Sequence, residues 1–340
     1  MTEAPFFSVV MPVFNGARFL PAALASLRAQ EPFPGGFEAV AADDGSADGS
    51  REMLEEAARN LPLRVVAGAR RGNWVASTNK AIGLCSGRMV VFLHQDDAWS
   101  PSRLRRLREE ADRTPGAGFL ANDTAFLGPD GRQVGTWRPP LPPGFSPPER
   151  CLPPTIVQNN LSVPGVALRR ELLERIGPLD ESLRYTADWD AWLRAMRAGG
   201  VLRVPETLSF FRVHAGSQTF ADFAVRRDAM RADLEAVLAR HLPAVREVVP
   251  ERAADRWERI ARLGVEADLF LASAGARAPL PWRPFVRAAF RAGPLAFLRF
   301  LSVSRVVPRT CSRLRAGLRP PSAGRGAGTP PGRRSRQDRP

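Results

Sequence analysis

Apolar runs and helical repeats alternate through roughly the first hundred residues of the chain. A short β-branched run bounded by turn residues is typical of a buried strand, and apolar spacing of three and four residues is typical of a helix. The runs predict strands over 7–14, 37–42, 63–67 and 89–93, and the repeats predict helices over 19–30, 48–60 and 75–85. This order predicts the α/β class, with a mostly parallel mixed sheet flanked by helices.

The pattern changes near residue 130. The stretch 137–154 is rich in proline and has no periodicity, so we expect a mobile loop there. Ser100 followed by Pro101 predicts the start of a helix, because Ser caps helices and Pro favours the first helical position. Further along, the pattern predicts helices over 170–176, 188–198 and 220–274, and strands over 201–204 and 208–213.

These patterns divide the chain of 340 residues into three expected parts. Residues 1–219 form an α/β domain, and 220–310 form a helical C-terminal extension. Residues 311–340 are rich in Arg, Gly and Pro, a composition that cannot bury enough apolar surface to fold, so we expect a disordered tail.

The formal net charge of +14 is concentrated near the C-terminus. From Gly275 onwards there are fifteen Arg and one acid, Asp338, so the preceding residues are neutral overall. The neutral body gives no reason to expect a nucleic acid partner, whereas the basic segment can bind anionic lipid, nucleic acid or an acidic protein. The alternative is a solvated tail from an Arg-biased genome, since Lys80 is the only lysine.

The segment 281–307 combines regularly spaced arginines with aromatic residues. Side chains four residues apart share one face of a helix, and a basic amphipathic helix is typical of membrane-surface binding. The alternative is a helix packed on the body, and Pro284 and Gly293-Pro294 are expected to interrupt any helix here. The residues concerned are Arg283, Arg287 and Arg291, with Trp282, Phe285, Phe297 and Phe300.

The pattern of cysteines and the lack of long apolar runs predict the cellular location of the protein. Cys85, Cys151 and Cys311 are far apart and form no CxxC, so neither a disulfide framework nor a zinc site is expected. The sequence has no basic-then-apolar leader and no uncharged apolar run of about 20 residues. We therefore expect a cytoplasmic protein, located at the inner face of the membrane if the basic segment binds lipid.

Three polar clusters, at 12–15, 43–46 and 94–97, follow predicted strands directly. Ligands of open parallel sheets bind beyond the carboxyl ends of the strands, so these clusters are candidate binding residues. Asp43 and Asp44 can accept hydrogen bonds from a nucleoside, although the same residues also favour an ordinary turn.

Asp96 and Asp97 are the more informative pair. Adjacent carboxylates after a buried strand repel each other unless a cation or a donor lies between them. Mg²⁺ or Mn²⁺ prefers oxygen ligands and can also bridge two phosphates. The alternative is a cap for the next helix, but the pair lies several residues before Pro101.

The sequence resembles the family-2 glycosyltransferases, which have the GT-A fold. The resemblance includes SVVMPVFN, DDGS, VFLHQDD and ADWDAWLR, and it covers about 6–219. The matching segments, in the order in which the family has them, are 8–15, 42–50, 79–82, 91–97, 168–173, 177–181, 187–194 and 211–214.

The resemblance implies an activity and its partners. A sugar would pass from a nucleotide-diphosphate donor, a UDP- or dTDP-sugar, to a hydroxyl of a glycan or a lipid-linked acceptor, in one displacement with inversion. The expected cofactor is Mn²⁺ or Mg²⁺, and the expected process is the synthesis of cell-surface polysaccharide.

The resemblance also implies roles for single residues. Asp188 would be the general base, although spacing alone favours the alternative that Asp188 and Asp190 are first-turn acids that complement a helix dipole. Asp97 would hold the metal. Apart from the resemblance, His214 follows a predicted strand, and a neutral His there can be a further metal or diphosphate ligand; the alternative is a surface residue at a strand end. The donor would be bound by Pro12, Phe14, Asn15, Asp43, Asp44, Asn79 and Asp96.

The chain departs from the family pattern at three positions. His94 stands where an Asp is common, Thr78 where Arg often precedes the Asn, and Ala187 where an acid often precedes the base. These departures keep a second function open, a catalytically silent sugar-nucleotide-binding or scaffolding protein of the same fold. A nucleotidyltransferase ranks last, because the glycine-rich, lysine-containing phosphate loop is absent.

Overall fold

The computed structural model describes residues 4–214, 216, 226–275, 280–304 and 306–315. The strands are β1 (Phe7–Val13), β2 (Phe37–Asp43), β3 (Leu63–Ala67), β4 (Met89–Phe92), β5 (Ala98–Trp99), β6 (Phe119–Leu127), β7 (Gln133–Trp137), β8 (Gly144–Ser146), β9 (Val166–Arg169) and β10 (Val201–Arg212). The helices are α1 (Leu20–Arg28), α2 (Ser50–Ala57), α3 (Trp74–Ile82), α4 (Arg103–Arg113), α5 (Pro148–Thr155), α6 (Arg170–Ile176), α7 (Ala187–Gly199), α9 (Arg227–Val248), α10 (Glu251–Gly275), α11 (Trp282–Ala292), α12 (Pro294–Ser304) and α13 (Val306–Arg315).

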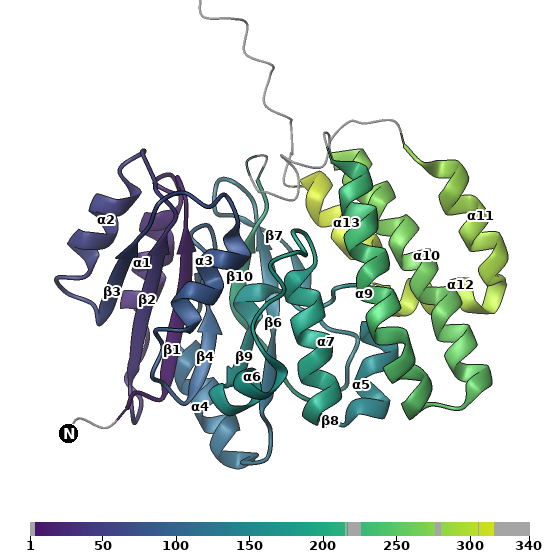
Figure 1. Ribbon diagram of the computed structural model, residues 1–340, viewed down its shortest axis with the longest axis horizontal. Coiled ribbons are helices and arrows are strands. Elements are labelled where there is room, and N and C mark those ends of the chain that lie inside the picture. The colour runs from purple at the N-terminus through teal and green to yellow at the C-terminus, as the bar shows by residue number, and fades with distance from the viewer. Residues whose placement is uncertain (1–3, 215, 217–225, 276–279, 305, 316–340) are drawn as a thin grey trace, which may run out of the picture.

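The strands form one mixed sheet with helices packed around it (Figure 1). The strand order is β3-β2-β1-β4-β9-β6-β10-β5, with β7 added to β6 and β8 to β10. Strands β3, β2, β1 and β4 are parallel, as is the long β6–β10 pair. The helices α9 to α13 gather at one end of the molecule (Figure 1). The predicted α/β class with a helical C-terminal part is confirmed.

Alternate residues of β1 reach two separate hydrophobic cores. Val9 and Met11 join the core that includes residues of α1, α2 and α4, while Val10 joins the core that includes residues of α3, α7 and α9. All seven residues of β1 are buried. A strand that is buried on both faces is expected to read as a continuous apolar run, which is how β1 appears in the sequence.

The prediction of a mobile loop over 137–154 is wrong, because this stretch contains β8 and α5. Helix α5 starts with Pro148, at a position where a helix needs no N–H, and Pro153 and Pro154 lie in its last turn. Cys151 and Leu152 are buried in the core, so tertiary packing outweighs the hydrogen bonds that the two late prolines cannot donate.

Two further elements differ from the predictions. Helix α4 begins at Arg103 with Ser102 as its N-cap, so Ser100 and Pro101 belong to the turn before it. The two strands predicted between 201 and 213 are one strand, β10, whose register with β6 shifts between Val204 and Ser209. The intervening Pro205 lacks the N–H that a regular ladder would use, which accounts for the irregularity.

The C-terminal predictions are corrected in part. Pro284 does not break a helix, because it lies in the first turn of α11, whereas Gly293-Pro294 separates α11 from α12 as expected. Helix α13 includes 311–315, which the prediction assigned to the disordered tail. The remainder of that tail, and the start of the helix predicted from residue 220, lie outside the described residues. No described helix is both long and apolar enough to cross a membrane.

Asp190 ties α7 to α9. Its carboxylate is fully buried and accepts hydrogen bonds from His241 Nε2 at 2.9 Å, Arg240 Nη1 at 2.8 Å and Arg194 Nε at 2.8 Å. Burial alone would raise the pKa of Asp190, but the hydrogen bond from His241 and the charges of the two arginines outweigh it and lower the pKa. The carboxylate is therefore ionised at neutral pH and fixes the first turn of α7.

Replacing Asp190 with Ala is expected to lower the free energy of unfolding by about 2–3 kcal/mol, because three donors lose a buried acceptor and the two arginines are only partly shielded from water. Urea denaturation measures this change. Glu171→Ala, an exposed acid in the first turn of α6, is the matched control and should change stability by less than about 0.5 kcal/mol. Equal effects of the two variants would contradict the anchoring role.

Candidate active site

The three polar clusters predicted from the sequence meet at one edge of the sheet. Strands β2, β1 and β4 are parallel neighbours, so their carboxyl ends lie side by side. Pro12 pairs with Ala42 and Val13 with Asp43, which brings the residues after β1 next to those after β2. Asn15 accepts a hydrogen bond from Ala47 N at 2.9 Å through its side-chain oxygen.

Asn15 takes a left-handed backbone conformation, with φ of 47°. Asn tolerates this region better than most residues, so its presence here agrees with a tight turn after β1. Its N–H donates to Ser46 Oγ at 2.9 Å, which joins this turn to the segment after β2. Arg70 lies over the ring of Phe14, with its guanidinium carbon 4.1 Å from the ring centroid.

The two acids after β2 have different partners. Both are buried, but Asp44 accepts from Arg71 N at 2.7 Å and Gly72 N at 2.9 Å, so it fixes the loop that follows β3. Asp43 accepts only longer hydrogen bonds from Ser46 N, at 3.2 and 3.4 Å, among the bonds of the described residues. Asp43 therefore retains more acceptor capacity for a ligand than Asp44 does.

Gln95 joins the turn after β4 to the end of β1, a connection that the sequence did not suggest. Its Oε1 accepts from Phe14 N at 2.7 Å and its Nε2 donates to Phe14 O at 3.1 Å. A Cβ at Gly16 would lie 2.5 Å from Gln95 Oε1, so Gly16 makes room for this pair of hydrogen bonds. These two hydrogen bonds hold the neighbouring Asp96 and Asp97 in position relative to β1.

Asp97 is a buried carboxylate with one satisfied oxygen. Its Oδ1 accepts from Arg212 N at 3.0 Å, whereas its Oδ2 has no hydrogen-bond partner among the described residues. Burial, together with the charge of Asp96, raises the pKa of Asp97 well above its ordinary value. An unpartnered buried carboxylate oxygen is costly unless a ligand completes it, so this atom marks a binding position.

Asp96 faces the end of β10. Its Oδ2 lies 2.9 Å from His214 Nε2, and its backbone oxygen accepts from Arg212 Nε at 2.9 Å. Burial opposes ionisation of Asp96, but the hydrogen bond with His214, together with the electrostatic effects of His94 and His214, outweighs it and lowers the pKa. His214 also packs against Phe19, with the ring centroids 4.6 Å apart. His214 thus contacts Asp96 directly.

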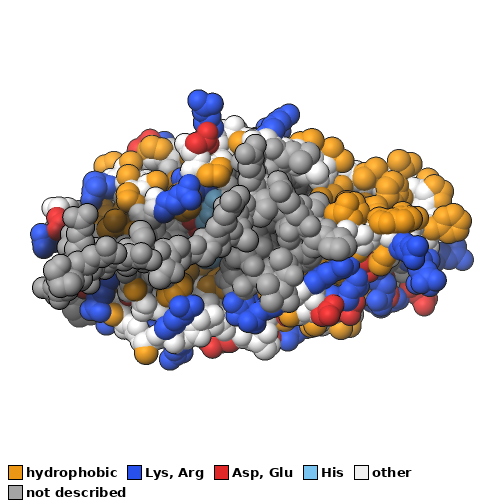
Figure 2. Space-filling model, turned by 90° about the horizontal axis from the view of Figure 1, so that it is seen from above, with side chains coloured by type: hydrophobic (Ala, Val, Ile, Leu, Met, Phe, Trp, Pro, Cys, Tyr) orange, Lys and Arg blue, Asp and Glu red, His pale blue; other side chains and the backbone are white. Residues whose placement is uncertain are grey.

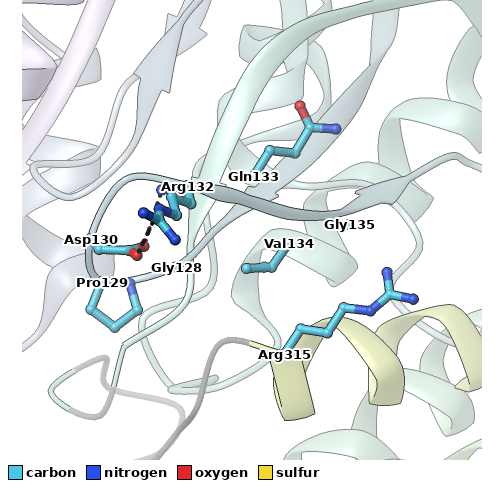
Figure 3. Close-up of a pocket in the computed structure, with 8 residues that line it drawn as sticks. All are labelled: Gly128, Pro129, Asp130, Arg132, Gln133, Val134, Gly135 and Arg315. Carbon is cyan, nitrogen blue, oxygen red and sulfur yellow. Dashed lines mark hydrogen bonds and ion pairs between the residues drawn. The ribbon is translucent and has the colours of Figure 1, made fainter.

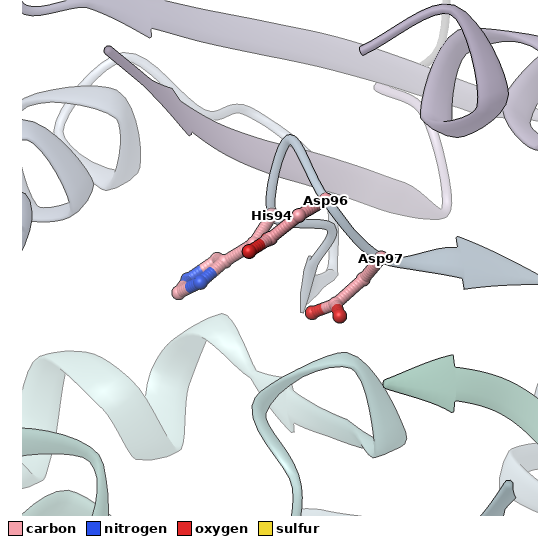
Figure 4. Close-up of side chains that lie close together, drawn as sticks. All are labelled: His94, Asp96 and Asp97. Carbon is pink, nitrogen blue, oxygen red and sulfur yellow. The ribbon is translucent and has the colours of Figure 1, made fainter. Parts of the chain in front are cut away.

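His94 completes a compact cluster with the two acids (Figure 4). One potential ligand atom from each of His94, Asp96 and Asp97 lies within 4.8 Å of the others. Burial lowers the pKa of His94, and its Nε2 has no hydrogen-bond partner in the described part of the chain. A neutral imidazole nitrogen can bind a metal, so His94 joins the candidate ligands.

Asp188 lies in the first turn of α7 and is half-buried. Its Oδ2 accepts from Asn159 Nδ2 at 2.7 Å, and its Oδ1 accepts from Trp189 N at 2.8 Å. Burial raises its pKa to about 6, although these two hydrogen bonds oppose the shift. A carboxylate with a pKa near neutrality is suited to accept a proton during a reaction.

Asn79 is engaged inside the protein. Its Nδ2 donates to Leu179 O at 2.9 Å and to Glu181 Oε1 at 3.0 Å, and its Oδ1 accepts from Leu179 N at 3.0 Å. These bonds join α3 to the loop before α7. The structure therefore places the Asn79 amide where it supports the loop that leads to Asp188.

A groove of about 700 Å³ lies apart from these residues, between the β6–β7 hairpin and the end of α13 (Figure 3). None of the predicted site residues lines it. Its lining residues are Gly128, Pro129, Asp130, Arg132, Gln133, Val134, Gly135 and Arg315. The three predicted polar clusters, 12–15, 43–46 and 94–97, lie instead at the ends of β1, β2 and β4.

The fold and the site together define an α/β protein with a carboxylate–imidazole cluster near the carboxyl ends of its parallel strands. The family model described as Glycosyl transferase family 2 matches residues 8–177, which is half of the chain. The chain belongs to this family, and the predicted membership is confirmed.

Three relatives are each less than 30% identical to the chain. The chain is 28% identical over 221 residues to an uncharacterized glycosyltransferase of Nostoc sp., which covers 62% of this chain and 65%, just under two thirds, of that protein. It is 27% identical over 193 residues to a PGL/p-HBAD biosynthesis glycosyltransferase of Mycobacterium tuberculosis, covering 56% and 70%. It is 28% identical over 248 residues to the succinoglycan biosynthesis protein ExoO of Rhizobium meliloti, covering 70% of each.

Solved structures share the fold at lower identity. TarS of S. aureus in complex with UDP-GlcNAc superposes with a TM-score of 0.58 at 16% identity, covering 92% of both chains. The mannosyltransferase PcManGT of Pyrobaculum calidifontis, in complex with GDP-Man and Mn²⁺, superposes with a TM-score of 0.53 at 17% identity, covering 93% and 87%. The predicted GT-A fold is confirmed.

Proposed function

We propose that the protein transfers a sugar from a nucleotide-diphosphate donor to an acceptor hydroxyl, with inversion at the anomeric carbon. The observation that carries the proposal is the buried, unpartnered Oδ2 of Asp97 beside Asp96 at the end of β4. Such an atom at the ligand-binding edge of an α/β sheet calls for a cation, and the donors of this family carry a diphosphate that a cation can bridge.

Asp97, Asp96 and His94 are the residues proposed to hold the metal. The carboxylate oxygens suit Mg²⁺ and Mn²⁺ alike, and the imidazole favours Mn²⁺, because Mg²⁺ binds almost only oxygen. When bound, the ion supplies a Lewis acid that offsets the charge of the departing diphosphate. His214, predicted from the sequence as a ligand, is better placed to orient Asp96, since its Nε2 lies 2.9 Å from the Asp96 carboxylate.

The nucleoside is proposed to lie at the ends of β1 and β2. Asp43 would accept a hydrogen bond from the base, while Pro12, Phe14 and Asn15 form the wall of this part of the site. Asp44 would act by fixing the 70–72 loop, to whose amides it is bonded. A UDP- or dTDP-sugar is the proposed donor.

Asp188 is proposed to act as the general base. It would take the proton of the acceptor hydroxyl while that oxygen forms a bond to the anomeric carbon, and the bond from this carbon to the phosphate oxygen breaks. The electron pair of that bond leaves with the nucleoside diphosphate. Asn159 would position the carboxylate through its 2.7 Å hydrogen bond.

The proposed acceptor is a glycan or a lipid-linked glycan of the cell envelope. Two relatives carry names from glycolipid and exopolysaccharide synthesis, PGL/p-HBAD biosynthesis glycosyltransferase and succinoglycan biosynthesis protein. Synthesis at the cytoplasmic face of the membrane would bring the enzyme to such an acceptor.

The test of the proposed function is ligand-dependent thermal stabilisation of the full chain. UDP or dTDP, and their sugar conjugates, are expected to raise Tm by several degrees with Mn²⁺ present, because a ligand that binds only the folded state stabilises it by mass action. EDTA should remove most of the shift. No shift with any nucleotide would contradict the donor site, and a shift without sugar transfer to any acceptor would favour the silent binding protein instead.

A further inference from the structure

Helices α11 and α12 present a row of large apolar side chains to solvent. Phe290 is 89% exposed and Leu295 is 81% exposed, values that are unusual for such residues in a folded protein. We call this surface the α11–α12 apolar face. Its members are Trp282, Val286 and Phe290 of α11, and Leu295, Leu298 and Leu301 of α12. Figure 2 shows hydrophobic side chains gathered over the end of the molecule that these helices form.

The exposed face is not the surface by which α11 packs. Phe285, Ala288 and Ala289 pack against the hydrophobic core, and Phe285 lies 5.6 Å from Phe270 of α10, measured between ring centroids. Trp282, Val286 and Phe290 follow at intervals of four residues on another side of the helix. Helix α11 is therefore docked on α10 and still has an apolar side with no cover among the described residues.

Positive charge accompanies this apolar face. Each of the three exposed apolar residues of α11 is followed by an exposed arginine, and α12 adds a further exposed one, Arg299. The sequence contains no Asp or Glu from Leu269 to Gln337, so no acid of this segment offsets the charge. A shallow concavity of about 420 Å³ on α11 combines both kinds of side chain and is lined by Trp282, Arg283, Val286, Arg287, Phe290 and Arg291.

We propose that the α11–α12 apolar face docks on an anionic lipid bilayer. Apolar and aromatic side chains beside arginines fit the boundary between acyl chains and acidic headgroups. Each of these helices has 11 residues, about 16 Å in length, and the hydrocarbon core is about 30 Å thick. The helices therefore lie along the membrane surface with Phe290 and Leu295 inserted.

Charge and composition disfavour two other molecules or segments that could cover this face, namely residues 316–340 of the chain and a second copy of the protein. Residues 316–340 contain one large apolar residue, Leu318, and six arginines, so they match neither the apolar surface nor its charge. A second copy that covered the face with the same face would bring arginines against arginines at each end of the contact. An acidic lipid surface supplies both the missing counter-charge and the apolar phase.

Flotation of the full chain with vesicles tests the proposal. Binding is expected to vesicles of phosphatidylglycerol and phosphatidylcholine, and to be at least tenfold weaker with pure phosphatidylcholine. Phe290→Ser combined with Leu295→Ser should weaken binding to the acidic vesicles at least tenfold, because both side chains lose their insertion. Arg287→Gln combined with Arg291→Gln should weaken it by about fivefold for each charge removed.

Matched controls come from surfaces elsewhere in the chain. Phe145→Ser replaces a 46% exposed aromatic on β8, and Arg51→Gln replaces an exposed arginine on α2, and neither should change flotation. The Tm of each variant, measured without any ligand, reports that the folded protein persists. The test does not depend on the proposed transfer activity, because binding to empty vesicles needs neither donor nor acceptor.

Three results would overturn the proposal. One is that the wild-type chain fails to float with acidic vesicles. Another is that Phe290→Ser with Leu295→Ser floats as well as wild type, which would assign any lipid binding to the arginine-rich tail. The third is that sedimentation equilibrium finds a dimer that these two substitutions dissociate, which would make the face an interface between copies.

Discussion

Replacing Asp188 with Asn is expected to lower kcat by about 10²–10⁴-fold, the usual contribution of a positioned general base. The amide keeps the size of the carboxylate and an oxygen that can accept from Asn159, but it cannot take a proton. The loss in kcat is measured as the rate of sugar transfer to an acceptor, which is monitored through the release of the nucleoside diphosphate. Donor-induced thermal stabilisation should be unchanged, because the residue acts on the acceptor.

The pH dependence of the same reaction supplies an independent check. The pKa of Asp188 is raised to about 6, so the base is ionised above that pH and protonated below it. The rate should therefore be flat above pH 7 and fall towards tenfold per unit below about pH 6, and the residual rate of Asp188→Asn should lack this limb. Glu171→Gln, at an exposed acid on α6, should behave as wild type. Normal turnover by Asp188→Asn would exclude the residue as the base.

Replacing Asp97 with Asn is expected to abolish the metal-dependent part of donor binding. Loss of a residue that merely supports a metal ligand costs about 10–100-fold in affinity or activity, so loss of a proposed ligand should cost about 100-fold or more. Titration with a UDP-sugar in the presence and absence of Mn²⁺ measures the change. Asp130→Asn, at an exposed acid on the β6–β7 hairpin, is the matched control and should bind normally.

The same substitution should leave the fold intact or stabilise it. Burial and the charge of the neighbouring Asp96 raise the pKa of Asp97, so both also destabilise its ionised form. Asn can still accept the hydrogen bond from Arg212 N through its oxygen. Unchanged or higher stability with lost donor binding would identify Asp97 as a binding residue, whereas unfolding of the variant would indicate a structural role.

The sequence predicted the edge of the sheet where the site lies, because the relevant information is local. The apolar runs that form β1, β2 and β4 end at polar clusters, and parallel strands bring those ends together. Asp96 and Asp97 belong to the cluster that follows β4, whose four residues are all buried. These inferences needed only the order of elements along the chain.

The remaining site residues depend on long-range contacts that no local pattern encodes. Asn159 meets Asp188 only because α5 folds, and two prolines had masked that helix. In the sequence, Gln95 is one polar residue of a polar cluster, and only the structure shows that it bonds to the end of β1. His94 is only a departure from the family pattern in the sequence, whereas the structure places its ring near Asp96.

Strand β6 could not be predicted from the sequence either, because buried polar residues interrupt its apolar pattern. β6 reads as polar in its middle, at 122–124, so its pattern does not indicate a buried strand. Arg103 is fully buried beneath it and donates to Asn122 Oδ1 at 3.2 Å, and burial lowers the pKa of this guanidinium to about 9. Polar groups inside a core can be recognised only when their partners are known.

The irregular middle of β10 has a consequence for how this chain can diverge. The first residues of β10 pair with β8, and its last residue, Arg212, donates its N–H to Asp97. The register shifts lie between these two parts of the strand. A β-bulge absorbs an extra residue without displacing the paired segments around it. We therefore expect that an inserted residue near Pro205 leaves in place both the pairing with β8 and the hydrogen bond from Arg212 N to Asp97.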